Sequence, residues 1–213
     1  MEIVVKTRAL AFASFLDRPV NGTGRLLLLL SIVALLAGGA LPLWRISLVA
    51  PQYAEGLTLD MYAYQIVAGN NGQDLAEINT LNHYIGMKPI AQADFLEMKL
   101  LPFAIGAFAL FGLRAAAVGR VMSLVDLTVT FVYFGAFSLG SFAYRLYTYG
   151  HQLDPRAPMK IDPFMPVVVG SQQIANFVQT SLPLAGTACM GLFLACLLAA
   201  LWTSAREARR EAI

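Results

Sequence analysis

The chain has 213 residues, of which 58% are hydrophobic and 13% are charged. Soluble domains carry about 25% charged residues, so this composition excludes an ordinary soluble protein and favours an integral membrane protein. The formal net charge is only +2, and the few basic residues form no stripe interleaved with aromatic side chains, which excludes a nucleic-acid-binding protein. Cys189 and Cys196 both lie in an apolar run and predict no disulfide framework.

The N-terminal segment, residues 1–25, is predicted to precede the first membrane span. Within it, residues 3–16 mix apolar side chains with Lys6 and Arg8, so they can form an amphipathic helix at the membrane surface or a disordered start. Residues 26–44 follow without a charge, close to the roughly 20 apolar residues that a spanning helix needs. This run is longer than a usual signal-peptide core, so we predict a retained transmembrane helix.

The second and third spans are predicted at residues 95–113 and 121–144. The second has a short uncharged core, and Asp94 and Glu97 have the spacing of a capping box, which predicts that its helix begins near residue 95. The third span is interrupted only by Asp126.

The fourth span is predicted at residues 182–203, with Thr180 or Ser181 as its N-cap and Pro183 in its first turn, where the missing N–H costs little. Residues 114–120 are predicted to form a short cytoplasmic loop between the second and third spans. The expected fold is therefore an all-α, antiparallel four-helix transmembrane bundle with two ordered extracytoplasmic loops that contain small α/β elements.

Lysine and arginine predict the orientation, because cytoplasmic flanks are enriched in them. Residues 1–25, 114–120 and 204–213 hold nine basic residues in roughly forty positions, whereas residues 45–99 and 145–181 hold six over about twice that length. Both termini are therefore predicted to lie in the cytoplasm, with the two long loops on the other side of the membrane.

Small residues recur every four positions in the last two predicted spans. They are Ala136 and Gly140 in the third span, and Thr187, Gly191, Ala195 and Ala199 in the fourth. Helices in lipid associate through close packing of small residues, so these stripes predict contacts either with other spans of the chain or with another subunit.

The first long loop, residues 45–94, has the pattern of folded structure. Apolar and polar residues alternate over residues 57–64, which predicts a strand. Asp74 and Glu77 then have the spacing of a capping box for a short helix, which Gly86 can end.

The second long loop, residues 145–181, is rich in proline and is expected to run extended across a surface before a short helix at residues 171–180. Its apolar residues predict packing against the first loop or against a partner. The residues that we expect to form an interaction surface are Tyr53, Tyr84, Pro158 and Phe164.

Both histidines and most methionines lie in or beside these loops. Thioethers suit Cu(I) and imidazole suits copper generally, so His83, Met87 and His151 are candidate metal ligands, with ordinary packing as the alternative. No cofactor other than copper is indicated. The sequence has no nucleophile elbow, phosphate loop or HExxH motif, and we expect a non-enzymatic protein.

Asp126 is the carboxylate that falls inside a predicted span. Such a residue is a functional hypothesis by default, because an ionisable group in lipid is costly. A proton path and a structural hydrogen bond or inter-subunit contact are both open.

Several short stretches resemble a known family. They are residues 50–57 (APQYAEGL), residues 81–88 (LNHYIGMK), Tyr149-Gly150-His151, Asp154-Pro155, Ala157-Pro158 and Ile174-Ala175-Asn176-Phe177. They are similar to the NosB-like small four-span membrane proteins of bacteria, which are associated with nitrous-oxide reductase and the maturation of its copper sites. The resemblance covers both loops and the four-span layout, and it implies no particular site residues.

The resemblance implies a location in the bacterial inner membrane and an accessory role beside a periplasmic copper enzyme in denitrification. We therefore expect a membrane protein that docks or assembles a periplasmic or membrane redox or maturation protein. Two alternatives stay open: a copper-handling protein that binds Cu(I) on its outer face, and a membrane subunit of a quinol- or proton-linked redox complex.

Overall fold

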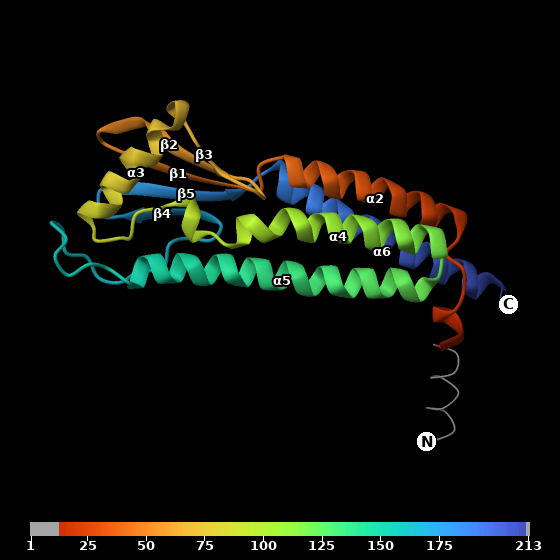
Figure 1. Ribbon diagram of the computed structural model, residues 1–213. Helices are drawn as coiled ribbons and strands as arrows, with labels where there is room; N and C mark the ends of the chain where they lie inside the picture. Colours follow the sequence, from red (N-terminus) through yellow and green to blue (C-terminus); the bar gives the residue numbers. More distant parts are fainter. Residues whose placement is uncertain (1–12, 212–213) are drawn as a thin grey trace, which may run out of the picture. The chain divides into compact units, whose positions relative to one another are not determined.

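The computed structural model describes residues 13–211, which divide into two compact units (Figure 1). The helical unit comprises the described parts of Met1–Ala37, Ala104–Gly135 and Cys189–Ile213, and the sheet unit comprises Gly38–Phe103 and Ala136–Ala188.

Four helices in the described part of the chain are long and apolar enough to cross a membrane: α2 (Gly22–Ala40), α4 (Glu97–Val118), α5 (Val121–His151) and α6 (Ala185–Glu211). The chain is therefore a multi-pass membrane protein by length and composition of its helices. The amphipathic helix expected at residues 3–16 lies largely outside the described residues.

Several ends of these helices differ from the ends of the predicted spans. Helix α2 ends at Ala40, and strand β1 (Trp44–Ala50) already begins at the last residue of the predicted span. Helix α5 continues beyond residue 144 to His151. The predicted N-cap and first-turn proline of the last span are wrong, since a strand runs through Pro183 and α6 begins at Ala185.

Aromatic side chains pack the interior of the helical unit. Phe131 of α5 lies edge-on to Phe108 of α4 and to Phe193 of α6, with ring centroids 5.2 and 4.6 Å apart. Such T-shaped contacts are favourable because the positive edge of one ring meets the negative face of the other.

Only some residues of the small-residue stripes contact other parts of the described chain. Thr187 Oγ1 donates a hydrogen bond to the Leu43 carbonyl, but a Cβ built at Gly140 or Gly191 would meet nothing within 4 Å. The prediction that these two glycines pack on other spans is therefore wrong for the described residues. The alternative, contact with another subunit, stays a prediction.

A five-stranded antiparallel sheet replaces the expected all-α architecture. Its order is β3 (Ile66–Ala68), β2 (Tyr53–Met61), β1 (Trp44–Ala50), β5 (Phe177–Pro183) and β4 (Gly170–Ile174). The all-α fold class is therefore wrong, and the two long loops of the sequence join into one sheet with β1 at its centre.

Strands β4 and β5 occupy the segment where a short helix was predicted at residues 171–180. Strand β5 buries Phe177, Gln179 and Ser181, so polar residues occupy two of its three inward positions. The alternation of apolar and polar residues that predicts a strand is therefore missing from its sequence. Ser181 is satisfied there because its Oγ accepts a hydrogen bond from Trp44 Nε1 at 2.8 Å and donates to the Val168 carbonyl.

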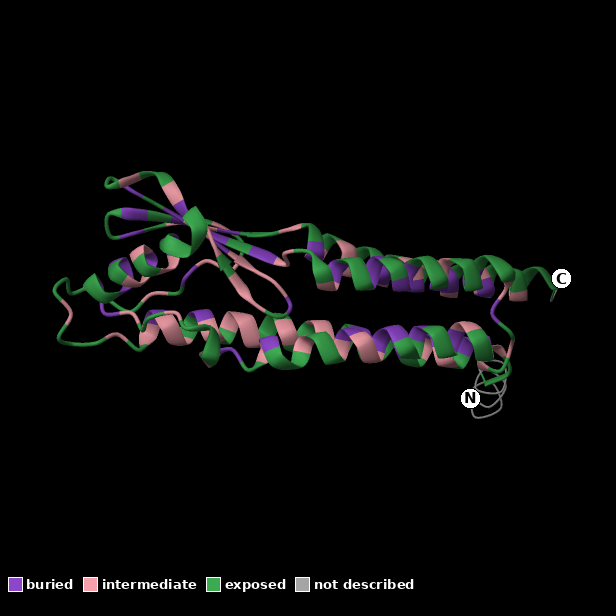
Figure 2. Cartoon of the chain, turned by 45° about the horizontal axis from the view of Figure 1, so that its top comes forward, coloured by how far each residue is buried: buried purple, intermediate pink, exposed green. Residues whose placement is uncertain are grey.

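One face of the sheet is covered by α3 (Gln73–Tyr84), whose Ile78 and Leu81 join a core that includes Leu59 of β2 (Figure 2). The predicted short helix is confirmed, but its capping box is wrong. Gly72 at φ +92° is the N-cap, and the buried Asp74 carboxylate instead accepts a hydrogen bond from the Thr58 backbone N–H at 2.8 Å.

Candidate functional site

The three candidate copper ligands have different surroundings. His83 is exposed beside Tyr84, Met87 is half-buried against the core of the sheet unit, and the His151 ring stacks on Tyr147 with centroids 3.8 Å apart. No group of three or more His, Cys, Asp or Glu among residues 13–211 is arranged to hold a metal ion. Copper binding by these residues stays a prediction, and it would require Met87 to leave apolar packing.

The four expected interaction residues separate into two pairs. Tyr84 and Pro158 are exposed. Tyr53 and Phe164 instead pack against the core, and the Tyr53 hydroxyl donates a hydrogen bond to the Glu77 carboxylate. This hydrogen bond, with smaller contributions from desolvation and the charge of Glu77, raises the pKa of Tyr53 above its usual value.

Asp126 has an exposed side chain near the start of α5. Its backbone carbonyl accepts a hydrogen bond from Thr130 Oγ1 at 2.7 Å, a contact that any residue at this position would keep.

We expect Asp126→Asn to change the free energy of unfolding by less than about 0.5 kcal/mol, because the side chain is exposed and the carbonyl contact is retained. Thermal unfolding of the variant and of the unchanged protein would be compared in mild detergent. A much larger decrease in stability would instead show that the carboxylate makes a structural contact.

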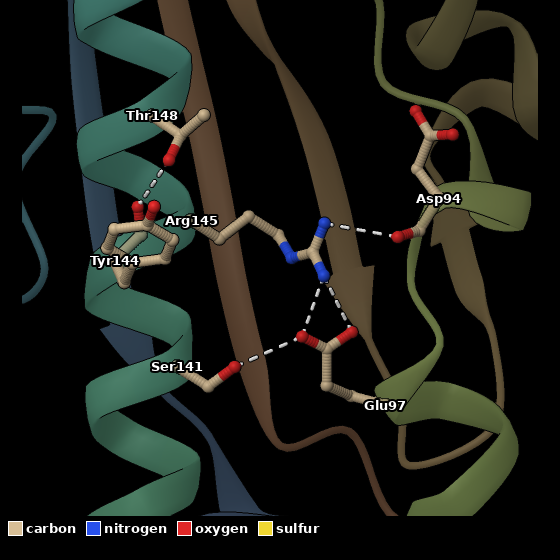
Figure 3. Close-up of polar contacts among 6 residues, drawn as sticks. All are labelled: Asp94, Glu97, Ser141, Tyr144, Arg145 and Thr148. Carbon is tan, nitrogen blue, oxygen red and sulfur yellow. Dashed lines mark hydrogen bonds and ion pairs between the residues drawn. The ribbon is translucent and has the colours of Figure 1, made fainter.

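A charged cluster joins the start of α4 to α5 (Figure 3). Arg145 Nη2 donates to both oxygens of Glu97 at 2.7 and 2.8 Å, and its Nη1 donates to the Asp94 carbonyl at 3.1 Å. Ser141 Oγ also donates to Glu97, and the guanidinium lies 4.7 Å from the centroid of the Phe95 ring. A planar guanidinium held on several sides in this way is fixed in position.

A second ion pair extends the cluster. Lys88 Nζ lies 2.8 Å from Asp94 Oδ2, and this hydrogen bond raises the pKa of Lys88 above its usual value. Lys88, Asp94, Glu97 and Arg145 together carry no net charge. The capping box predicted for Asp94 and Glu97 is therefore wrong, since both carboxylates pair with basic side chains that are distant in sequence or outside the helix.

No protein-family model, curated protein or solved structure matches this chain.

Beside the cluster, the sheet unit has a partly open pocket of about 60 Å³. Its walls are mainly apolar and come from strands β1, β2, β4 and β5, from α3 and α5, and from the segments that connect them. Two buried polar atoms among its lining residues have no hydrogen-bond partner in the described chain, the Asn82 Nδ2 and the Tyr149 hydroxyl.

Both atoms are almost inaccessible to a water-sized molecule. Asn82 is only 3% exposed, and a buried polar group without a partner costs about 1–3 kcal/mol. The sequence alone did not bring Asn82 and Tyr149 together, because they lie far apart in the chain, although both fall within stretches that carry the family resemblance.

Proposed function

We propose that this chain is a non-enzymatic accessory protein of the bacterial inner membrane, with both termini in the cytoplasm. Its sheet unit docks a periplasmic copper enzyme of the nitrous-oxide-reductase type and assists its assembly or supply. The observation that carries this proposal is that the two long loops fold together and present exposed aromatic and apolar side chains at one place. The resemblance to NosB-like proteins supports the choice of partner.

The docking residues lie on a surface that we name the loop surface, which consists of His83, Tyr84, Pro158 and Met159. All four are exposed. Exposed aromatic and methionine side chains are typical of the centres of protein interfaces.

Backbone contacts hold the loop surface in shape. The Met159 N–H donates to the Tyr84 carbonyl at 2.9 Å, and the Asp154 N–H donates to the Gly86 carbonyl at 2.8 Å. Gly86 lies at φ +80°, and a Cβ there would come within 2.9 Å of the Asp154 carbonyl oxygen. A surface fixed in this way loses little conformational entropy when a partner binds.

The copper-handling alternative has less support from these contacts. Met87 contributes to the core and His151 stacks on Tyr147, so the three candidate ligands would need a rearrangement to converge.

The test introduces a photo-crosslinking amino acid at position 84 of the full chain in nanodiscs, with purified nitrous-oxide reductase as the partner. The matched control carries it at position 178, where Val178 is 40% exposed in strand β5 on the face opposite the core. We expect a crosslinked adduct from position 84 and none from position 178.

We also expect Tyr84→Ala to weaken binding about tenfold, as loss of a central aromatic contact does. Equal adducts from both positions, or no adduct from either together with unchanged affinity of Tyr84→Ala, would contradict docking through the loop surface.

A further inference from the structure

We propose that one end of the helical unit binds the phosphate of an anionic phospholipid through the guanidinium groups of Arg25 and Arg120. Both side chains are exposed, the first in the opening turn of α2 and the second immediately before α5. This inference concerns a different unit from the loop surface and does not rest on docking.

Close packing of α2 against α4 fixes the position of Arg25. A Cβ at Gly112 would lie 2.9 Å from Ile32 Cγ1, and a Cβ at Gly119 would lie 2.9 Å from Arg25 Cζ, so the helices run in opposite directions (Figure 1). Both pairs are seven residues apart along their helices, which keeps the same two faces in contact over about two turns. The Arg25 guanidinium therefore lies against the backbone of Gly119, where the chain leaves α4 at φ +65°.

Backbone hydrogen bonds hold Arg120 beside this position. The Val20 N–H donates to the Gly119 carbonyl at 2.5 Å, and the Val121 N–H donates to the Arg18 carbonyl at 3.0 Å. Residues 18–20 thus pair with residues 119–121 as a short antiparallel bridge. Because Arg25 lies against the residue that precedes Arg120, the two basic groups belong to one braced region of the surface.

This region lacks compensating negative charge. Among residues 13–211, no carboxylate pairs with Arg25 or Arg120, and neither guanidinium has a hydrogen-bond partner. The described part of the helical unit contains seven arginines and four carboxylates, and residues 1–12 of the sequence contain two basic residues and one acidic residue. An anion from outside the chain would therefore be attracted here.

The helix ends increase this attraction. The N-terminal end of a helix carries a partial positive charge, so a cation there is unfavourable and an anion is favourable. Arg25 lies in the first turn of α2, and Arg120 precedes the first residue of α5. The C-terminal end of α4 offsets the charge of Arg25 in part, but its carbonyls accept no hydrogen bond from this guanidinium among the described residues. A phosphate would be stabilised by two helix N-termini and by two groups suited to bidentate hydrogen bonds.

The position of the two arginines favours a lipid over a soluble phosphate. Helices α2, α4 and α5 are candidate spans, and the start of α2, the end of α4 and the start of α5 lie together, so they mark one boundary of the membrane. Leu26 and Leu29 follow Arg25 on α2 and are 58% and 47% exposed, which offers acyl chains an apolar surface next to the phosphate. The excess of positive charge favours a headgroup with a net negative charge, such as phosphatidylglycerol.

The test uses native mass spectrometry, which resolves single bound lipids. The full chain in mild detergent would be titrated with phosphatidylglycerol, with phosphatidylcholine and with inorganic phosphate. We expect the first phosphatidylglycerol to bind more tightly than the first phosphatidylcholine, and Arg25→Gln to weaken it about fivefold. Arg25→Lys keeps the charge and is expected to retain most of the affinity.

The matched control is Arg209→Gln, which removes the same charge from the exposed last turn of α6. It is expected to leave the affinity for the first phosphatidylglycerol unchanged. The Arg25 guanidinium has no partner among the described residues, so the lipid-free Arg25→Gln variant is expected to unfold at the same temperature as the unchanged protein.

Three outcomes would overturn the proposal. Equal affinities for the two lipids would mean that the headgroup charge is not recognised. Equal weakening by Arg25→Gln and Arg209→Gln would indicate attraction by the overall charge of the surface rather than a site. Binding of inorganic phosphate as tight as that of phosphatidylglycerol would assign the region to a soluble anion.

Discussion

Replacement of Gly150 with alanine is expected to destabilise the sheet unit by about 3 kcal/mol. A Cβ at this position would lie 2.0 Å from the Phe164 carbonyl oxygen and 2.7 Å from Pro166 Cδ. The backbone carbonyl cannot turn away as a side chain can, so the segment that carries Phe164 must move. That movement breaks the hydrogen bond from the Phe164 N–H to the Gly150 carbonyl and opens the pocket at Pro166.

Gly140→Ala in the same helix is the matched control, because a Cβ there meets nothing within 4 Å. This substitution is expected to stabilise α5 by up to about 1 kcal/mol through the higher helix propensity of alanine. Thermal unfolding in detergent would be measured for both, with a decrease of about 6–12 °C expected for Gly150→Ala alone. Equal midpoints for the two variants would show that the loop is not packed on Gly150.

Arg145→Met is expected to cost about 2–3 kcal/mol of stability. The side chains of Arg145 and Glu97 are 28% and 36% exposed, so the pair is partly shielded from water. Without the guanidinium, the Glu97 carboxylate retains the hydrogen bond from Ser141 but no cation, and the Asp94 carbonyl loses its side-chain donor. Methionine keeps the length and most of the apolar stem, which confines the loss to these polar contacts.

A double-mutant cycle separates the ion pair from the other contacts of Arg145. We expect Arg145→Met/Glu97→Gln to regain about 1 kcal/mol relative to Arg145→Met, because the neutral amide no longer leaves a shielded charge unpaired. Strict additivity of the two substitutions in unfolding experiments would mean that the pair contributes nothing beyond its separate members.

The spans were predictable from sequence because hydropathy depends on long runs, and all four runs became helices. The sheet was only partly predictable. Strand β2 alternates apolar and polar residues through Leu57 and Leu59 and was expected, although it begins earlier, at Tyr53. Strand β1 was missed because its first residue, Trp44, was assigned to the preceding span, and the alternation of Ile46 and Leu48 with Arg45 and Ser47 was not recognised in the short run that remained.

The turn between β4 and β5 shows a second reason. Its first residue, Ala175, lies at φ +49°, a conformation that usually requires glycine or asparagine. Because alanine is not a typical turn residue, the sequence does not predict this hairpin. The inward positions of Gln179 and Ser181 also interrupt the alternation of apolar and polar residues that predicts a strand. The candidate site was beyond sequence analysis for a related reason, since pairing between Arg145 and Glu97 depends on how α4 and α5 lie beside each other.

The central position of β1 also governs how the chain can be made. Its partner β2 follows almost at once in the sequence, but Ser47 pairs with Thr180 on the other edge, 133 residues later (180 − 47). At roughly 5–20 residues per second, a ribosome takes on the order of ten seconds to supply that strand. During this interval a half-finished sheet with an unpaired edge would already have left the membrane on its outer side, given the orientation proposed above, and such an edge readily pairs with other chains. In that orientation, we expect the free edge of β1 to need protection until β5 pairs with it.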